Sequence, residues 1–99
     1  MAGQYRIALS ASKDLDQISQ YFLSQNVEAG DRLFQEFNRK CRNLVEFPNL
    51  GRSYEEILPS LRGIPLNGYI IFYEVIGDDV TILRIVSGRQ NLQELFGDE

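Results

Sequence analysis

The sequence contains no histidine and only one cysteine, Cys41. Histidine is the commonest general acid–base group and a frequent metal ligand in proteins, and an internal disulfide requires a second cysteine. These absences exclude histidine-based catalysis, a disulfide framework and a cysteine–histidine metal cluster. We therefore expect no cofactor, and we expect Cys41 to be a buried thiol that no histidine activates.

A basic surplus and a long apolar run are missing as well. The formal net charge is −4 at pH 7 and the pI is about 4.8. Dedicated nucleic-acid binders usually carry excess positive charge, so we expect no strong direct binding to nucleic acid, although a local basic patch is compatible with these values. No segment has the length and apolarity of a membrane span, and the N-terminus does not have the pattern of a signal peptide. We expect a cytoplasmic protein without a membrane partner.

The sequence also shows no internal repeat, no low-complexity tract and no linker. Its 99 residues are 43% hydrophobic and 11% aromatic, a composition that is typical of a folded domain. We therefore predict a single domain, residues 1–99, with a modest core.

The stretch 69–87 is the most informative part of the chain. Its runs 69–76 and 80–87 are rich in β-branched and aromatic residues and flank Gly77-Asp78-Asp79, which predicts a β-hairpin. Both runs are apolar on both faces, so we expect central strands that are covered on both sides. Arg84 interrupts this pattern and needs a partner.

The register of this hairpin stays open at the level of sequence. A three-residue loop places Arg84 opposite Phe72 and diagonal to Glu74, whereas a two-residue loop places it opposite Tyr73. If Arg84 has a purely structural role, we expect it to pair with Glu74, and we expect Arg62 to pair with an acid of the pair Glu55-Glu56.

Two amphipathic helices precede this hairpin. After a short strand at 4–9, Ser10 or Ser12 is a candidate cap, and Asp14 and Asp16 fall in the first helical turn. The apolar face of this helix and that of a second helix, 27–46, are expected to form the core; they comprise Leu15, Ile18, Tyr21 and Phe22, and then Leu33, Phe34, Phe37, Cys41, Leu44 and Val45. Asn26 separates the helices and caps the second, which ends before Pro48.

The remaining segments complete the predicted fold. Residues 49–60 read as a mobile loop, residues 61–64 as a strand, and Asn67-Gly68 as a turn. We predict an α+β domain, in which a two-helix hairpin packs on a mainly antiparallel four-stranded sheet in the order β-α-α-β-β-β, followed by a short C-terminal tail. Because two helices cover only one face of the sheet, the other face must be covered by the loop 49–60, by the tail or by a partner chain.

Several local strings resemble the RelE/ParE superfamily of bacterial toxins, and the ParE branch in particular. The resemblance lies in Phe47-Pro48 followed by Leu50-Gly51-Arg52, in Leu61-Arg62 with Pro65 and Tyr69-x-Ile71-Phe72-Tyr73, and in Ile82-x-Arg84-Ile85-Val86-x-Gly88-Arg89 followed by Leu92 and Leu95-Phe96. Asp14-Leu15 in the first helix is similar too. These strings run along nearly the whole chain with matching spacings.

This resemblance implies the toxin of a type II toxin–antitoxin system, which a cognate antitoxin neutralises in a hetero-oligomer. ParE-like members inhibit DNA gyrase, so gyrase is the implied target. RelE-like members are ribosome-dependent endoribonucleases that cut mRNA, which is one alternative function. A degenerate member that binds its antitoxin without toxicity is another.

The nuclease alternative would have to use Arg62, Arg84 and Arg89, which occupy matching positions. Arginine stabilises phosphate charge, but it stays protonated and so transfers protons poorly. The resemblance places Ser87 where several nuclease relatives have histidine, and we expect Tyr69 and Tyr73 to be sheet core rather than acids. We therefore lean away from an enzyme.

The expected contacts to antitoxin or target combine cations and an apolar tail. The candidate cations are Arg52, Arg62, Arg84 and Arg89, of which Arg84 and Arg89 can hold carboxylates of an acidic antitoxin segment. The tail can form one wall of an apolar groove through Leu92, Leu95 and Phe96.

Overall fold

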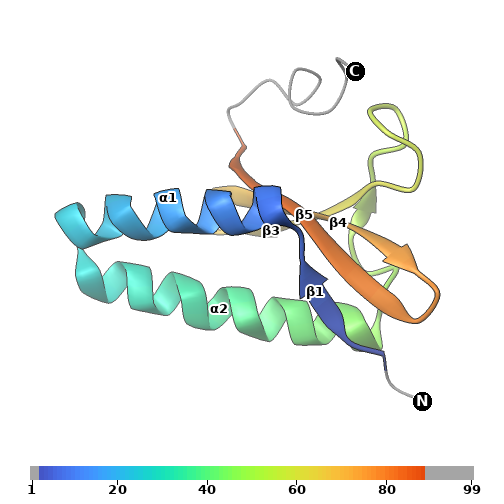
Figure 1. Cartoon of the computed structure of the whole chain (residues 1–99), viewed down its shortest axis with the longest axis horizontal. Coiled ribbons are helices and arrows are strands. Elements are labelled where there is room, and N and C mark those ends of the chain that lie inside the picture. Colours follow the sequence, from blue (N-terminus) through green and yellow to red (C-terminus); the bar gives the residue numbers. More distant parts are fainter. Residues whose placement is uncertain (1–2, 89–99) are drawn as a thin grey trace.

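The structure, a computed structural model, describes residues 3–88. Two helices form one layer and a five-stranded sheet forms the other, and both helices lie on the same side of the sheet (Figure 1). The elements are β1 (Tyr5–Ile7), α1 (Leu9–Gln25), α2 (Val27–Glu46), β2 (Arg52–Ser53), β3 (Arg62–Leu66), β4 (Tyr69–Ile76) and β5 (Asp79–Ser87).

The sheet has the strand order β1-β5-β4-β3-β2. Strand β1 is parallel to β5, and every other neighbouring pair is antiparallel. The predicted α+β class and helix hairpin are confirmed. The sheet has five strands instead of four, because Arg52 and Ser53, in the expected loop 49–60, pair with Gly63 and Arg62 of β3.

Helix α2 agrees with its predicted bounds, whereas α1 begins earlier than expected. The Asn26 side chain accepts a hydrogen bond from the Ala29 N–H at 3.1 Å and so caps α2. Helix α1 starts at Leu9 after Ala8, which makes no side-chain cap. The predicted serine cap is therefore wrong: Ser10 donates its hydroxyl to the Leu83 carbonyl at 3.0 Å, and Asp14 lies in the second turn.

The β4–β5 hairpin has a two-residue loop, Gly77-Asp78, since Ile76 pairs with Asp79. With this loop, an uninterrupted register would place Arg84 opposite Ile71, so the predicted pairing with Tyr73 for a two-residue loop is wrong. Instead, Tyr73 pairs with Ile82 and Phe72 with Arg84, so that Leu83 is an extra residue in β5. This β-bulge re-aims the side chains that follow it. As a result, Ile82 and Ile85, three positions apart, both reach the core under the helices.

Residues of α1, α2, β3, β4 and β5 form the core under the helices. Phe37 is 3% exposed, and Cys41 and Tyr73 are fully buried, as expected for Phe37 and Cys41 from their places on the α2 stripe. Burial raises the pKa of the Cys41 thiol to about 12, partly offset by Arg42, so the thiol is protonated at neutral pH. Phe22 and Phe34 are only half-buried against this core.

A second, smaller cluster covers the opposite face of the sheet. It is centred on Leu61, Phe72 and Val86 and includes half-buried side chains of the segment 49–60, namely Tyr54, Ile57 and Leu58. The Tyr54 ring meets the Phe72 ring edge-on at 5.0 Å between centroids. The sequence left open whether the loop 49–60, the tail or a partner chain covers this face. The loop 49–60 contributes to that cover.

Strand β3 runs two residues further than predicted and includes Pro65. Proline has no N–H to donate, and β2 pairs only with Arg62 and Gly63, so Pro65 lies where β3 has no outer neighbour. Asn67 and Gly68 then form a tight turn with φ of 45° and 88°, as the Asn-Gly dipeptide predicts. Within residues 3–88, no helix combines the length and apolarity that crossing a membrane requires.

Candidate functional site

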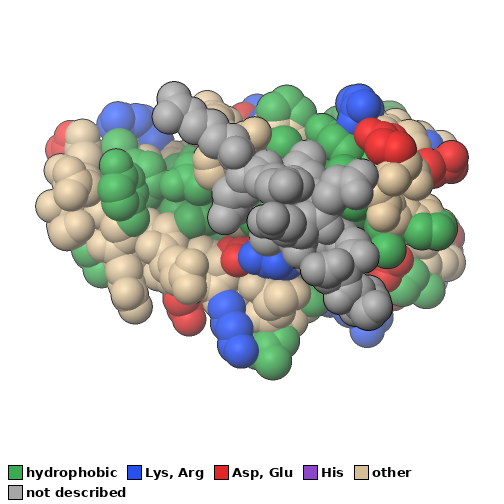
Figure 2. All heavy atoms as spheres, turned by 90° about the horizontal axis from the view of Figure 1, so that it is seen from above, with side chains coloured by type: hydrophobic (Ala, Val, Ile, Leu, Met, Phe, Trp, Pro, Cys, Tyr) green, Lys and Arg blue, Asp and Glu red, His purple; other side chains and the backbone are tan. Residues whose placement is uncertain are grey.

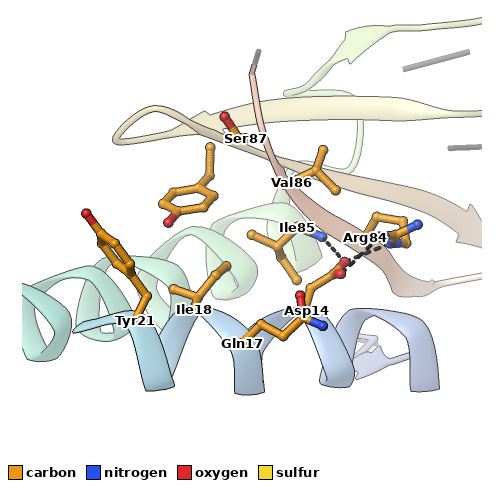
Figure 3. Close-up of a pocket in the computed structure, with 9 residues that line it drawn as sticks. Asp14, Gln17, Ile18, Tyr21, Arg84, Ile85, Val86 and Ser87 are labelled. Carbon is orange, nitrogen blue, oxygen red and sulfur yellow. Dashed lines mark hydrogen bonds and ion pairs between the residues drawn. The ribbon is translucent and has the colours of Figure 1, made fainter. Parts of the chain in front are cut away.

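A groove of about 340 Å³ lies between α1 and the C-terminal end of β5 (Figure 3). Ile18, Ile85 and Val86 supply its apolar lining. An ion pair, two tyrosines, an amide and a hydroxyl supply its polar groups; the full lining is Asp14, Gln17, Ile18, Tyr21, Tyr69, Arg84, Ile85, Val86 and Ser87.

Asp14 and Arg84 form the ion pair of this groove. Arg84 donates from Nε to Asp14 Oδ2 at 2.7 Å and from Nη2 to Oδ1 at 3.0 Å, and the Ile85 N–H donates to Oδ2 at 2.9 Å. The hydrogen bond to Asp14 raises the pKa of the Arg84 guanidinium. The side chains of Arg84 and Asp14 are only 24% and 12% exposed, which strengthens a bidentate contact of this kind.

The predicted pairing of Arg84 with Glu74 is therefore wrong. The bulge at Leu83 brings Arg84 and the Ile85 N–H to the same carboxylate on α1 (Figure 3). A sequence signal for this contact existed: Asp14 is four residues before the buried Ile18 and thus on the same helix face, whereas Asp16 is not. With both edge nitrogens of Arg84 bound to Asp14, this arginine is poorly placed to hold a carboxylate of a partner.

Two tyrosines lie at another part of the groove. Tyr21, predicted to be core, is 56% exposed, and this prediction is wrong because the outer ends of both helices extend beyond the sheet (Figure 1). Tyr69 is half-buried, and its pKa is raised first by burial and then by its neighbour Tyr21. In the view from above, a small group of hydrophobic side chains lies near the helical end of the molecule, whose tip consists mainly of other side chains and backbone (Figure 2). Ile18, Ile85 and Val86 are only 7%, 2% and 3% exposed, so the surface that the groove presents to a partner is mainly aromatic.

Arg62 has a different environment, at the loop that follows α2. It donates from Nη1 to the Gly51 carbonyl at 2.6 Å and to the Asn49 carbonyl at 3.5 Å. Tyr73 holds the same loop, since its hydroxyl donates to the Pro48 carbonyl at 2.7 Å and accepts from the Gly51 N–H at 2.9 Å. We call these four hydrogen bonds the loop clamp. Gly51 fits only because it has no side chain: a Cβ there would lie 2.7 Å from the Tyr73 hydroxyl oxygen.

The predicted partner of Arg62 is wrong as well. No described carboxylate lies within ion-pair distance of Arg62, and Glu56 pairs instead with Arg52 at 3.3 Å. Arg52 is exposed and stacks on the Tyr54 ring at 4.1 Å, as a surface role requires. Arg89, Leu92, Leu95 and Phe96 lie outside the described residues.

Two candidate proton-transfer residues, Tyr73 and Lys40, are engaged in hydrogen bonds to the backbone. Tyr73 is buried with both hydrogen-bonding functions of its hydroxyl in use, and burial raises its pKa, partly offset by the Gly51 N–H and the Arg62 charge. Lys40 donates from Nζ to the Pro65 carbonyl at 2.7 Å, away from Arg84. Across residues 3–88, no group of three acidic or cysteine side chains is placed to hold a metal ion. RNA cleavage needs a general acid and a general base, and in the described chain neither Tyr73 nor Lys40 is free for such a role.

Comparison with known proteins gives consistent matches over the length of the chain. A sequence model for the family described as the ParE toxin of the type II toxin–antitoxin system, parDE, matches residues 5–92. Toxin ParE3 of Caulobacter vibrioides is 32% identical over 87 residues, which cover 87% of this chain and 87% of that protein. A chain of the chromosomal ParDE TA system from P. aeruginosa has the same fold, with a TM-score of 0.72 at 22% identity over 88% of this chain and 96% of that chain.

Proposed function

The chain belongs to the ParE family of toxins of type II toxin–antitoxin systems, and on that premise we propose that it inhibits DNA gyrase in the cytoplasm until a cognate antitoxin binds it. The observation that carries this proposal is the family match over residues 5–92, which spans both helices and all five strands. The choice of gyrase over mRNA rests on the chemistry of the site. A nuclease needs proton-transfer groups, and in the described chain both Tyr73 and Lys40 donate to backbone carbonyls instead.

The antitoxin, in this proposal, forms a hetero-oligomer with the toxin by laying an apolar segment in the groove between α1 and β5. Tyr21 is exposed and Tyr69 is half-buried in this groove, and their aromatic rings suit the apolar anchors of an amphipathic segment. Arg84 supports this groove through Asp14 and is not itself the anchor for an antitoxin carboxylate. Arg52, Arg89, Leu92, Leu95 and Phe96 remain proposed contacts to antitoxin or target.

The target is tested with purified protein and purified gyrase in a supercoiling assay. We expect inhibition that increases with toxin concentration and disappears when the antitoxin is added. The same preparation is then added to a translation reaction with a defined mRNA, where we expect no cleavage. Codon-phased cuts in that mRNA, with gyrase unaffected, would overturn the proposal in favour of a ribosome-dependent endoribonuclease.

The antitoxin groove is tested by two exposed α1 residues, of which only one lines it. Tyr21→Ser should weaken antitoxin binding by about tenfold, because it removes an aromatic anchor. Leu23→Ser is the matched control, since Leu23 is 66% exposed on the same helix but outside the groove. A chain truncated after Gln90 tests the tail residues in the same isotherms. Equal affinity of wild type, Tyr21→Ser and the truncated chain would place the antitoxin on another surface.

A further inference from the structure

Arg62 has an unused hydrogen-bonding edge. Its Nη1 donates to the carbonyls of Gly51 and Asn49, and no hydrogen bond joins Nε or Nη2 to any residue in the range 3–88. A guanidinium carries N–H donors on all three nitrogens, and the Nε–Nη2 edge matches the two oxygens of a carboxylate. Half of this cation is therefore fixed by the loop clamp while the other half keeps its donors.

This side chain lines a pocket of about 240 Å³. Ser53, Ser60 and Asn49 add hydroxyl and amide groups, and Glu55 is the other charged residue among its described lining, which is completed by Leu61 and Val75. Ser60 has a φ of 67°, a left-handed conformation that costs a residue with a Cβ free energy. Backbone strain of this kind is retained where surrounding structure enforces it, and here it accompanies a polar pocket beside a fixed cation.

Arg84 shows what the Arg62 pocket lacks. The Nε and Nη2 atoms of Arg84 both bind the carboxylate of Asp14, at 2.7 and 3.0 Å. The corresponding atoms of Arg62 have no carboxylate among the described residues, although the cation is held in place by the loop. A carboxylate from another molecule would complete the same arrangement.

We propose that the Arg62 pocket binds an aspartate or glutamate side chain of the protein that this toxin inhibits. The assignment to the target rests on the proposed function, in which the antitoxin occupies the groove between α1 and β5. The two sites have no lining residue in common, so they are separate sites on the toxin. Glu55 in the pocket and the net charge of −4 oppose a chain of nucleic-acid phosphates, whereas a single carboxylate can bind Arg62.

The chemistry of the pocket is tested without any partner, by NMR of the arginine Nε–H groups during a titration with sodium acetate. The Arg62 signal should shift saturably, and the Arg84 signal should not, with sodium chloride at equal ionic strength as the control. Glu55→Gln should tighten acetate binding roughly two- to fivefold, because it removes a nearby like charge. A linear response of Arg62, or tighter binding of inorganic phosphate than of acetate, would overturn the carboxylate assignment.

The source of the carboxylate is tested with two variants in the supercoiling and antitoxin-binding assays. Arg62→Lys keeps a donor for the loop but loses the bidentate edge, so inhibition of gyrase should weaken about tenfold while antitoxin affinity stays unchanged. Glu55→Gln should inhibit at least as well as wild type. Unchanged inhibition by Arg62→Lys, or a parallel loss of antitoxin affinity, would overturn the assignment to the target. If wild type leaves gyrase unaffected, the proposed function and the assignment to this target both fail, and the acetate titration still decides the chemistry.

Discussion

Arg62 and Arg84 lie on the same sheet, but different kinds of acceptor bind their N–H groups. Each is half-buried and each needs acceptors for its N–H groups. Arg84 uses a carboxylate from α1, seventy residues earlier in the chain, whereas Arg62 uses backbone carbonyls of the loop after α2. The first arginine joins a helix to the sheet, and the second holds a loop.

The difference teaches that an arginine can be satisfied without being neutralised. The ion pair with Asp14 leaves little of the Arg84 charge for a ligand. Carbonyl oxygens accept hydrogen bonds from Arg62 but carry no net charge, so the positive charge of Arg62 stays available. Within the described chain, both edge nitrogens of Arg84 are engaged by Asp14, so Arg62 is the better candidate for binding an acidic group.

A core substitution gives the reference value against which the stability effects of changing the two arginine sites are compared. Phe37 is 3% exposed, and Phe37→Ala should lower the free energy of unfolding by about 3–5 kcal/mol through lost burial and a cavity. Urea titrations of wild type and variant measure this loss. Leu23→Ala, at an exposed position on α1, should change stability by less than about 1 kcal/mol. A loss below about 1 kcal/mol for Phe37→Ala would show that the core is not organised around α2.

The ion pair is broken by Asp14→Ala. The change leaves Arg84 without its carboxylate and the Ile85 N–H without its acceptor, so the free energy of unfolding should fall by about 2–4 kcal/mol. A double-mutant cycle with Arg84→Ala isolates the coupling between the two side chains. Simple additivity of the two losses would contradict the view that Asp14 and Arg84 act as a unit.

Much of the fold was predictable because its signals are local. The bounds of α2 follow from its apolar stripe, from Asn26 and from Pro48, and the turn at Asn67-Gly68 follows from the dipeptide. The extra residue Leu83 had no such signal, because a β-bulge depends on what both neighbouring elements accept. Strand β2 was missed for a similar reason, since two residues carry too little pattern to mark a strand.

The candidate site was predictable in its residue types but not in its contacts. The sequence singled out Arg84 as needing a partner and named Glu74, its near neighbour in the predicted hairpin. The actual partner lies on a different element, and its position depends on the bulge and on the packing of α1. The groove residues Gln17 and Tyr69 were not proposed as binding residues, because only the docked helix brings them to one surface.

Arg62→Ala tests how much the hydrogen bonds from Arg62 to the loop contribute to stability. Removing the guanidinium leaves the Gly51 and Asn49 carbonyls without this donor, which should lower the free energy of unfolding by about 1–2 kcal/mol. Because Arg62 has no carboxylate partner in the described chain, a double-mutant cycle with Glu55→Ala should give a coupling below about 0.5 kcal/mol. Coupling as strong as that of Asp14 with Arg84 would mean that Glu55 already neutralises Arg62, and the contrast between the two arginines would be lost.

The smallest expected effect is a dependence of stability on pH, which distinguishes the contribution of Tyr73 to the loop clamp from that of Arg62. Tyr73 shares the clamp with Arg62, and burial raises the pKa of the Tyr73 hydroxyl in the folded protein. The contribution of this hydroxyl to stability is therefore complete below the pKa of tyrosine in the unfolded chain, which is about 10. As pH rises through the higher folded pKa, deprotonation removes the hydrogen bond to the Pro48 carbonyl and this contribution is lost. Tyr73→Phe should cost about 1 kcal/mol at neutral pH, where the Gly51 N–H loses its acceptor, and should flatten the fall in stability at alkaline pH.

Tyr69, whose pKa is also raised, keeps part of that alkaline slope, so Tyr69→Phe is the matched control. Urea titrations from pH 8 to beyond pH 10 measure both slopes. If the slope is the same with and without the Tyr73 hydroxyl, that hydroxyl does not hold the loop, and Arg62 alone fixes the segment that opens onto its pocket.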